Sequence, residues 1–289
     1  MTRSDIPPAP WRVGIISQLP VAANAYTGLL RSLGHEPVVH IATRRFNPRL
    51  APPAEALPFL GRVYSDGPND IDFASPPSKA SLTRILRSYE LDLVLCTAFP
   101  WRIPAEAIAA VRLGIVNGHP SLLPHYRGPM PFGWQIRNGE SEIGLTYHFM
   151  DAEFDTGAIL GQGSVPFTDE DTQEGLWLKL GELAGTLLPS VLARIAAGDP
   201  GDPQEGGSYQ SLFEEDYVLV DPAATAAEVH RQVRAWEFTP WARTSERGPI
   251  LERDGSRIRI LKSSLAQADG AERLECADGP LWILESEPA

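Results

Sequence analysis

The sequence contains few cysteines and no long uninterrupted apolar stretch. Its two cysteines, Cys96 and Cys276, stand far apart in unrelated surroundings, which excludes a disulfide framework and a zinc-ligand spacing. No apolar run approaches the roughly 18 to 20 residues that a membrane-spanning helix requires. The N-terminus, MTRSDIPPAPW, is polar and proline-rich and lacks the apolar core of a signal peptide. These absences predict a cytoplasmic protein that does not associate with a membrane.

Basic residues are also scarce relative to acidic ones. The chain has 25 Lys and Arg against 37 Asp and Glu, a formal net charge of −12. Proteins that bind nucleic acid usually present a basic surface, because neutralising phosphates releases counterions. The acidic total therefore lowers the expectation of a large polyanionic partner, although it does not exclude a local basic groove. The 289 residues, 43% of them hydrophobic, suffice for one large domain and a small one.

A dinucleotide-binding fingerprint is absent as well, although the chain begins as an α/β protein. An apolar strand at 13–17, a helical pattern at 21–33 and a second strand at 37–43 predict a parallel sheet. The turn after the first strand reads SQLPVAAN and contains no G-x-G-x-x-G.

The segment from 44 to 78 interrupts this regular order. It holds seven prolines and little periodicity, so we expect a long irregular excursion, with room for a short helix near Ala54. Such loops are uncommon inside compact domains and often functional, but a tolerated surface insertion explains the pattern equally well. Regular structure then resumes, with strands expected at 91–99, 114–117, 143–150 and 158–166 and helices at 79–89, 103–111, 132–137 and from 171 onward.

The composition divides the chain into two domains. Residues 198–208, GDPGDPQEGGS, have the glycine and proline content of a linker. We expect residues 1–200 to form an α/β, Rossmann-like domain with a mostly parallel sheet. Residues 205–289 are expected to form a small, mostly-β open barrel with one helix at 223–236.

Polar side chains follow the strand at 114–117. Ligands of parallel α/β sheets bind beyond the carboxyl ends of the strands, where Asn117 and His119 lie, and Gly118 between them is expected to allow close approach of a ligand. A second loop, DAEFDTG, brings Asp155 to a turn. Asparagine can stabilise an oxyanion, histidine can transfer protons near neutral pH, and aspartate can orient the histidine. Spacing alone leaves this interpretation open, because many loops contain these three residue types.

Two longer segments resemble the folate-dependent formyltransferases. They read NGHPSLLPHYRGPMPFGWQIRNGE at 117–140 and GLTYHFMDAEFDTGAIL at 144–160. That family includes methionyl-tRNA, glycinamide ribonucleotide and sugar-amine formyltransferases and a formyl-tetrahydrofolate hydrolase domain. The resemblance implies an enzyme that takes a formyl group from 10-formyl-tetrahydrofolate without a metal. It assigns the catalytic roles to Asn117, His119 and Asp155.

The resemblance extends to FPWRIP at 99–104, which in the family lines the pterin pocket largely with backbone groups. From SYQSLFEED onward, the C-terminal part resembles a shortened form of the β-barrel domain of the methionyl-tRNA branch. The donor contacts that the resemblance implies come from two loops and are Phe99, Trp101, Arg102, Ile103, Pro104, Met150 and Asp151.

The resemblance does not identify the acceptor amine. Residues 205–289 carry 9 Lys and Arg against 16 Asp and Glu, and 9 − 16 gives −7. This charge disfavours initiator tRNA and favours a small amine, such as an amino sugar or an amino acid derivative. Two alternatives stay open: hydrolysis of the same folate with water in place of the amine, and a tRNA enzyme whose arginines form basic patches. The arginines available for such patches are Arg231, Arg234, Arg253, Arg257 and Arg259, and separately Arg44, Arg45 and Arg49.

Two further side chains near these motifs have competing interpretations. His148, on the strand before the aspartate loop, is expected to be a packed histidine rather than a catalyst. Arg127 is equally consistent with binding an anionic group and with bracing its own loop.

Overall fold

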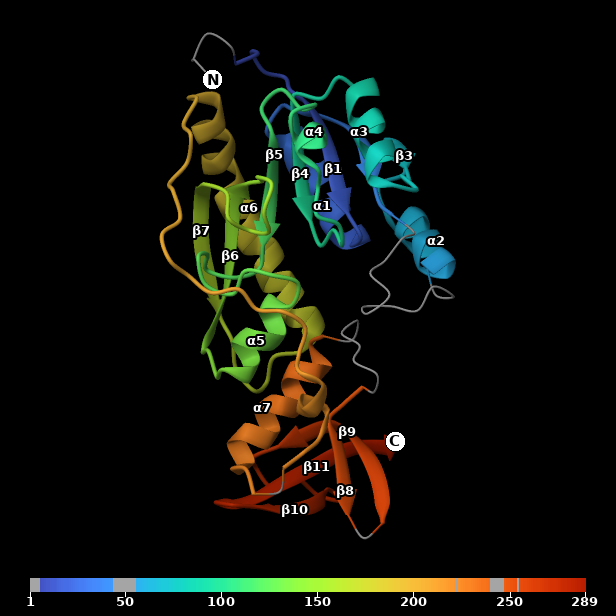
Figure 1. Cartoon of the computed structure of the whole chain (residues 1–289), viewed down its shortest axis with the longest axis vertical. Helices are drawn as coiled ribbons and strands as arrows, with labels where there is room; N and C mark the ends of the chain where they lie inside the picture. Colours follow the sequence, from blue (N-terminus) through green and yellow to red (C-terminus); the bar gives the residue numbers. More distant parts are fainter. Residues whose placement is uncertain (1–5, 44–55, 222, 240–246, 254) are drawn as a thin grey trace.

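The computed structural model describes residues 6–43, 56–221, 223–239, 247–253 and 255–289. Among these residues the strands form two sheets (Figure 1). The larger sheet has seven strands in the order β3-β2-β1-β4-β5-β6-β7, and the smaller has four in the order β10-β11-β9-β8. The smaller sheet lies at the far end of the long axis of the molecule, below the larger one in Figure 1.

The first half of the large sheet is parallel, as the strand and helix alternation predicts. Its central strands are almost wholly buried, which is typical of parallel strands covered by helices on both faces. Helix α3 begins at Ser78, whose hydroxyl accepts the Ser81 N–H. The elements in chain order are β1 (Arg12–Ser17), α1 (Pro20–Ser32), β2 (Glu36–Ile41), α3 (Lys79–Ser88), β4 (Leu93–Thr97), α4 (Ala105–Ile108) and β5 (Ile115–His119).

The prediction of an irregular excursion from 44 to 78 is wrong for part of this segment. Helix α2 (Ala56–Asp66) and strand β3 (Asp72–Ala74) lie within it, and β3 adds to the sheet beside β2. Pro58 falls in the first turn of α2, where a missing N–H removes no intrahelical hydrogen bond. Residues 44–55, with Arg44, Arg45 and Arg49, lie outside the described residues.

An antiparallel hairpin completes the large sheet. After α5 (Pro131–Arg137), strand β6 (Glu142–Phe149) pairs antiparallel with β5, and β7 (Ile159–Pro166) pairs antiparallel with β6. The long helix α6 (Gln173–Ala196) packs against this hairpin. Its N-terminus is capped by Thr172, whose hydroxyl accepts the Gly175 N–H at 3.0 Å.

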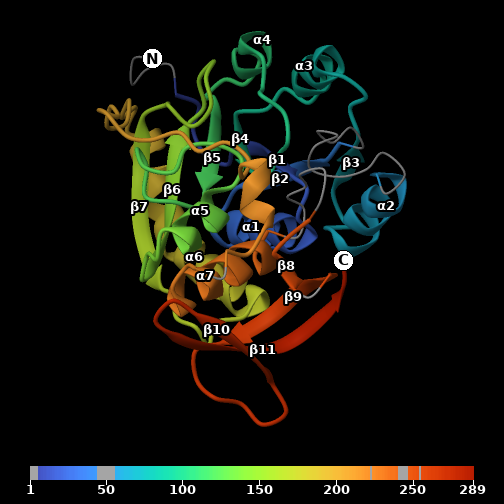
Figure 2. The same ribbon diagram turned by 60° about the horizontal axis from the view of Figure 1, so that its bottom comes forward.

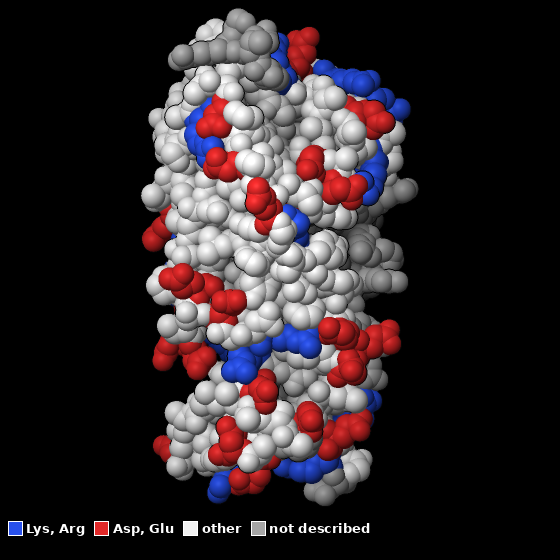
Figure 3. Space-filling view, turned by 60° about the vertical axis from the view of Figure 1, so that its left-hand side comes forward, with Lys and Arg blue, Asp and Glu red and all other residues white. Residues whose placement is uncertain are grey.

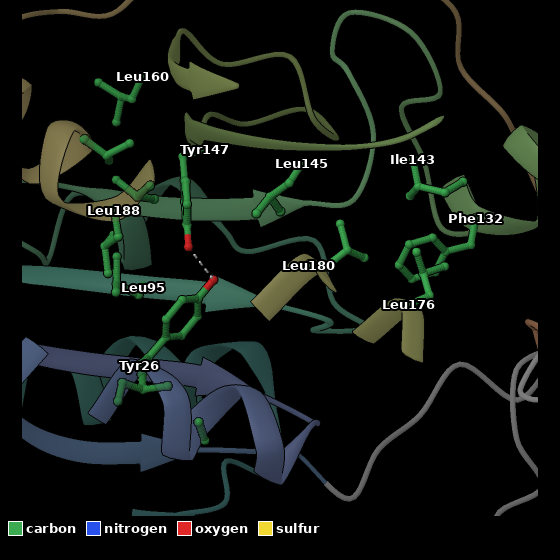
Figure 4. Close-up of a cluster of buried hydrophobic side chains, with 14 of the residues drawn as sticks. Tyr26, Leu95, Phe132, Ile143, Leu145, Tyr147, Leu160, Leu176, Leu180 and Leu188 are labelled. Carbon is green, nitrogen blue, oxygen red and sulfur yellow. Dashed lines mark hydrogen bonds between the residues drawn. The ribbon is translucent and has the colours of Figure 1, made fainter. Parts of the chain in front are cut away.

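By length and composition alone, α6 is apolar enough to cross a membrane, contrary to the expectation from the sequence. Core helices of globular proteins meet the same criterion, and α6 has such a role here. In Figure 4, Leu180 of this helix lies below Leu145 of β6, Leu188 lies to the side of Tyr147, and Leu176 lies beside Phe132. This packing accounts for the buried face of α6, which makes up 28% of its apolar window.

The C-terminal part folds as a sheet with one helix against it. Its elements after the 3-10 turn η3 (Glu215–Val218) are α7 (Ala226–Glu237), β8 (Ile250–Arg253), β9 (Ser256–Ser264), β10 (Glu272–Cys276) and β11 (Gly279–Pro288). Thr225 and Glu228 form a capping box at the start of α7. Figure 2 shows α7 between this sheet and α5 of the large domain. Together the two sheets confirm the predicted fold class, a Rossmann-like α/β sheet with a small β domain.

The buried guanidinium of Arg234 joins α7 to the large domain. It donates to the carbonyl oxygens of Thr168 at 3.1 Å and Asp171 at 2.8 Å, just before α6. It also lies over the ring of Phe238 at 4.7 Å from the centroid. These contacts commit the Arg234 side chain to the contact between the domains.

Candidate active site

The register between β5 and β6 positions the polar side chains of the site. Side chains alternate between the two faces of a strand, so Asn117 and His119 share one face of β5. His148 of β6 lies directly opposite Asn117 and therefore shares that face. His119 and His148 are buried and Asn117 is half-buried, which places polar groups together in a region of low dielectric constant.

Gly118 points to the opposite face, toward the core. A β-carbon there would lie 2.8 Å from the hydroxyl of Tyr26 and 3.4 Å from the ring of Tyr147. The two tyrosine hydroxyls are 3.3 Å apart beneath the site (Figure 4). Packing inside the protein thus requires the glycine, and the close approach of a ligand at this position stays a prediction.

The loop after β6 turns Asp155 into the same cluster. Asp155 has φ = 58°, a left-handed conformation that non-glycine residues adopt at a cost. Two residues later, a β-carbon at position 157 would lie 1.8 Å from the carbonyl oxygen of Phe149, so only glycine fits there. The carboxylate accepts the Gly128 N–H at 2.8 Å, and its side chain is 11% exposed. The loop therefore presents an almost buried carboxylate to the residues of β5.

The structure brings together the three residues expected to be catalytic. Asp155 Oδ1 lies 3.4 Å from Asn117 Nδ2 and 3.6 Å from His119 Nδ1. An amide donor, an imidazole and a carboxylate therefore share one point, although Asp155 is 38 residues from Asn117 in the sequence.

The hydrogen-bond partners of His119 fix its resting tautomer. Its Nε2 lies 2.8 Å from the carbonyl oxygen of Tyr126, which can only accept, so Nε2 carries the proton. Burial lowers the pKa of His119, and the charge of Asp155 only partly opposes this. Neutral His119 therefore turns an unprotonated Nδ1 toward the carboxylate. A proton that arrives at Nδ1 forms an ion pair with Asp155.

Asp155 itself stays ionised. Burial alone would raise its pKa, but the neighbouring imidazoles of His119 and His148, which attract the carboxylate when they are charged, and the Gly128 N–H hold the pKa well below its usual range. The site thus holds a permanent negative charge beside a neutral imidazole at neutral pH. This arrangement stabilises positive charge that develops on His119.

His148 is buried, as expected of a packed histidine, and it also joins this cluster. Its Nδ1 donates to the carbonyl oxygen of Phe149 at 2.8 Å, which leaves Nε2 to accept from Asn117 Nδ2 at 3.2 Å. The same Nε2 lies 3.7 Å from Asp155 Oδ1. The signal that could have revealed it is register: a residue that pairs with Asn117 across an antiparallel ladder must share its face.

The expected donor contacts lie on two loops that touch each other. Arg102, after β4, donates to the carbonyl oxygen of Ala152 and pairs with Glu153 at 2.6 Å. Phe99 and Trp101 meet edge to face with centroids 5.4 Å apart. The Arg102 contacts hold the loop after β4 against the aspartate loop, whereas the aromatic pair lies within the loop after β4.

The remaining expected contacts differ in what they can offer a ligand. Ile103 is 1% exposed in the core, so only its main chain is available, and Pro104 serves as the N-cap of α4. Met150 packs against the same core cluster as Ile103. Asp151 accepts the Thr156 hydroxyl at 2.7 Å and shapes the loop. Contact of these residues with the folate stays a prediction.

Arg127 braces its loop rather than standing free for an anion. Its Nε and Nη2 donate to Gln204 Oε1 at 3.0 and 2.7 Å. Gln204 in turn donates to the carbonyl oxygens of Asp155 and Gly157. Residues of the expected linker therefore take part in the architecture of the site, a role that the sequence did not predict.

Comparison with known proteins identifies the family. A family model described as formyl transferase matches residues 71–192, which include the whole cluster. A methionyl-tRNA formyltransferase of Myxococcus xanthus (strain DK1622) is 30% identical over 253 residues, which cover 84% of this chain and 78% of that protein. The chain belongs to the formyltransferase family. The prediction of a folate-dependent formyltransferase, with 10-formyl-tetrahydrofolate as donor, is confirmed at the level of the family.

Other members of the family act on different acceptors, and the fold itself is more widespread. A GDP-perosamine N-formyltransferase of Brucella melitensis is 36% identical over 155 residues, 53% of this chain and 60% of that protein. The structure of HypX from Aquifex aeolicus in complex with tetrahydrofolic acid has a similar fold, with a TM-score of 0.67 and 18% identity. The match covers 97% of this formyltransferase and 44% of HypX.

Proposed function

We propose that this formyltransferase moves the formyl group of 10-formyl-tetrahydrofolate to the primary amine of a small molecule, such as an amino sugar or an amino acid derivative. Asn117, His119 and Asp155 are its catalytic residues. The observation that carries the proposal is that Asn117 Nδ2 and His119 Nδ1 both lie within 3.6 Å of one oxygen of the nearly buried Asp155 carboxylate.

The chemistry follows from this arrangement. When a neutral amine attacks the formyl carbon, negative charge develops on the formyl oxygen and positive charge on the amine nitrogen. The Asn117 amide group donates to His148 at 3.2 Å and to Asp155 at 3.4 Å. The longer bond, to Asp155, is the weaker one, so that N–H can turn to the oxyanion. His119, once protonated at Nδ1, supplies further positive charge. Asp155 stabilises that imidazolium and helps move the proton from the amine toward the leaving folate nitrogen.

A small acceptor is supported by the charges of the C-terminal sheet. In the described part of this sheet, each Lys or Arg on a strand pairs with a glutamate, so these side chains do not form a continuous phosphate-binding surface. On the face shown in Figure 3, basic and acidic side chains are intermixed. Arg234, one of the arginines that could have joined a basic patch, is instead buried against α6. The strand pairs are Arg253 with Glu272, Arg257 with Glu252 at 3.0 Å, Arg259 with Glu287 at 2.5 Å, Lys262 with Glu285 at 3.4 Å and Arg273 with Glu275 at 2.6 Å.

The similar proteins favour two acceptors. The Brucella melitensis relative supports an amino sugar, because its name places the formyl group on GDP-perosamine. The Myxococcus xanthus relative, which matches over more of this chain, favours methionyl-tRNA as the second candidate.

A product survey tests the proposal. The enzyme is incubated with 10-formyl-tetrahydrofolate and either a panel of nucleotide-linked amino sugars and amino acid derivatives, methionyl-tRNA, or no acceptor, and products are identified by mass spectrometry. We expect a formylated small amine, formed faster than free formate. Formylation of methionyl-tRNA alone would contradict the small acceptor, and formate as the main product with every amine would indicate a hydrolase.

A further inference from the structure

The segment between α6 and η3 is bonded along the catalytic loops instead of spanning freely between the domains. In Figure 1 it runs beside β7 and then crosses toward α7. We call residues 202–210 the strap. At one end, Asp202 and Ile159 exchange both main-chain hydrogen bonds at 2.8 Å. At the other, Arg127 donates to Ser208 at 3.0 Å and accepts from Gln210 at 2.7 Å through the main chain.

Gln204 lies between these two attachments and joins the two catalytic loops through its side chain. Its Nε2 donates to the carbonyl oxygens of Asp155 at 3.0 Å and Gly157 at 2.7 Å. Its Oε1 accepts from Arg127 Nε at 3.0 Å and Nη2 at 2.7 Å. The amide thus uses both donors and both acceptor positions.

Both loops that Gln204 joins determine where the Asp155 carboxylate lies. One contains Asp155 itself, in its left-handed conformation at φ = 58°, which surrounding contacts must enforce. The other contains Gly128, directly after Arg127. The Gly128 N–H donates to Asp155 Oδ2 at 2.8 Å. Displacement of either loop changes the distance from Asp155 to His119.

We propose that Gln204 is a positioning residue for formyl transfer: it fixes Asp155 at the distance from His119 and Asn117 that the reaction needs. The inference rests on the proposed catalytic role of Asp155. The side-chain hydrogen bonds of Gln204 go to Arg127 and to the carbonyl oxygens of the aspartate loop, so Gln204 acts through the main chain of that loop. Small misplacements of catalytic groups lower turnover steeply, so the effect is expected in kcat rather than in donor binding.

Two variants test this role in the full chain. Gln204→Ala removes all four hydrogen bonds, whereas Gln204→Glu keeps the size and the acceptor for Arg127 but turns a carboxylate toward two carbonyl oxygens. Gln210→Ala, on the same strap, is the matched control, because the main-chain bonds of the strap remain. We expect kcat per folded site to fall about 10- to 100-fold in both Gln204 variants, with the KM of the donor changed less than about twofold and the control near wild type.

A double-mutant cycle separates positioning from a merely structural role. If Gln204 acts through Asp155, Gln204→Ala should cost no further activity in an Asp155→Asn background. Multiplicative losses, or a fall in thermal stability with kcat unchanged per folded site, would overturn the proposal. Wild-type turnover in Asp155→Asn alone would instead contradict the proposed function, so the two failures are distinguishable.

Discussion

Replacement of Asp155 by asparagine removes the one permanent charge of the cluster while keeping its shape. An amide oxygen can still accept the Gly128 N–H, so the loop should fold as before. The lost term is the attraction between the carboxylate and protonated His119 at 3.6 Å. At an effective dielectric constant of about 20, this attraction is about 5 kcal/mol. Water and the amide dipole replace part of it, so about 3 to 4 kcal/mol of transition-state stabilisation should be lost.

The expected result is a fall in kcat of about a hundred- to a thousandfold, since each 1.36 kcal/mol is tenfold. The assay follows formylated amine by mass spectrometry under saturating donor, with folding checked by circular dichroism. The pH profile gives a second reading. Asp155 raises the pKa of His119 against the lowering effect of burial. If His119 causes one limb of the curve of rate against pH, loss of the carboxylate should therefore move that limb to lower pH. Turnover within about fivefold of wild type in the folded variant would refute this reasoning.

Three further changes test separate parts of the structure. Asn117→Ala should cost about 3 kcal/mol of transition-state stabilisation, measured as a loss in kcat/KM, because one oxyanion donor disappears; an unchanged value would remove Asn117 from the mechanism. His148→Ala should lower kcat by about tenfold, because it removes the acceptor at 3.2 Å that orients the Asn117 amide; a full rate would show that this bond is dispensable. Gly118→Ala should destabilise the fold by about 1 to 3 kcal/mol in denaturant unfolding, since its β-carbon meets the Tyr26 hydroxyl at 2.8 Å. Tyr26→Phe in the same chain should restore part of that loss, and a loss that Tyr26→Phe leaves unchanged would place the strain elsewhere.

The parts of the site that could be predicted lie in contiguous sequence. Asn117 and His119 belong to one short strand, and Asp155 belongs to a loop whose acidic and glycine residues mark a turn. Local periodicity also predicted most strands of the large sheet, because buried parallel strands form short apolar runs. The short helix expected near Ala54 has its counterpart in α2 at 56–66, where Pro58 occupies the tolerated first turn, whereas the strand at 72–74 was not predicted.

The rest depended on contacts that are distant in the sequence. His148 could be placed beside Asn117 only through the exact pairing of β5 with β6, 31 residues apart. Gln204 reaches Asp155 across 49 residues from a segment whose glycines and prolines resemble an ordinary linker. Such side-chain bonds have no period in the sequence, so composition alone assigned the segment to a connection between domains.

The most direct test of the central claim is a competition in one reaction. Wild-type enzyme receives limiting 10-formyl-tetrahydrofolate with an equimolar nucleotide-linked amino sugar and methionyl-tRNA, across a series of salt concentrations, and both formylated products are quantified by mass spectrometry. The intermixed charges of the C-terminal sheet predict that the small amine receives most of the formyl group and that its yield depends weakly on salt. Preferential formylation of methionyl-tRNA, falling steeply as salt rises, would contradict the account and identify tRNA as the acceptor.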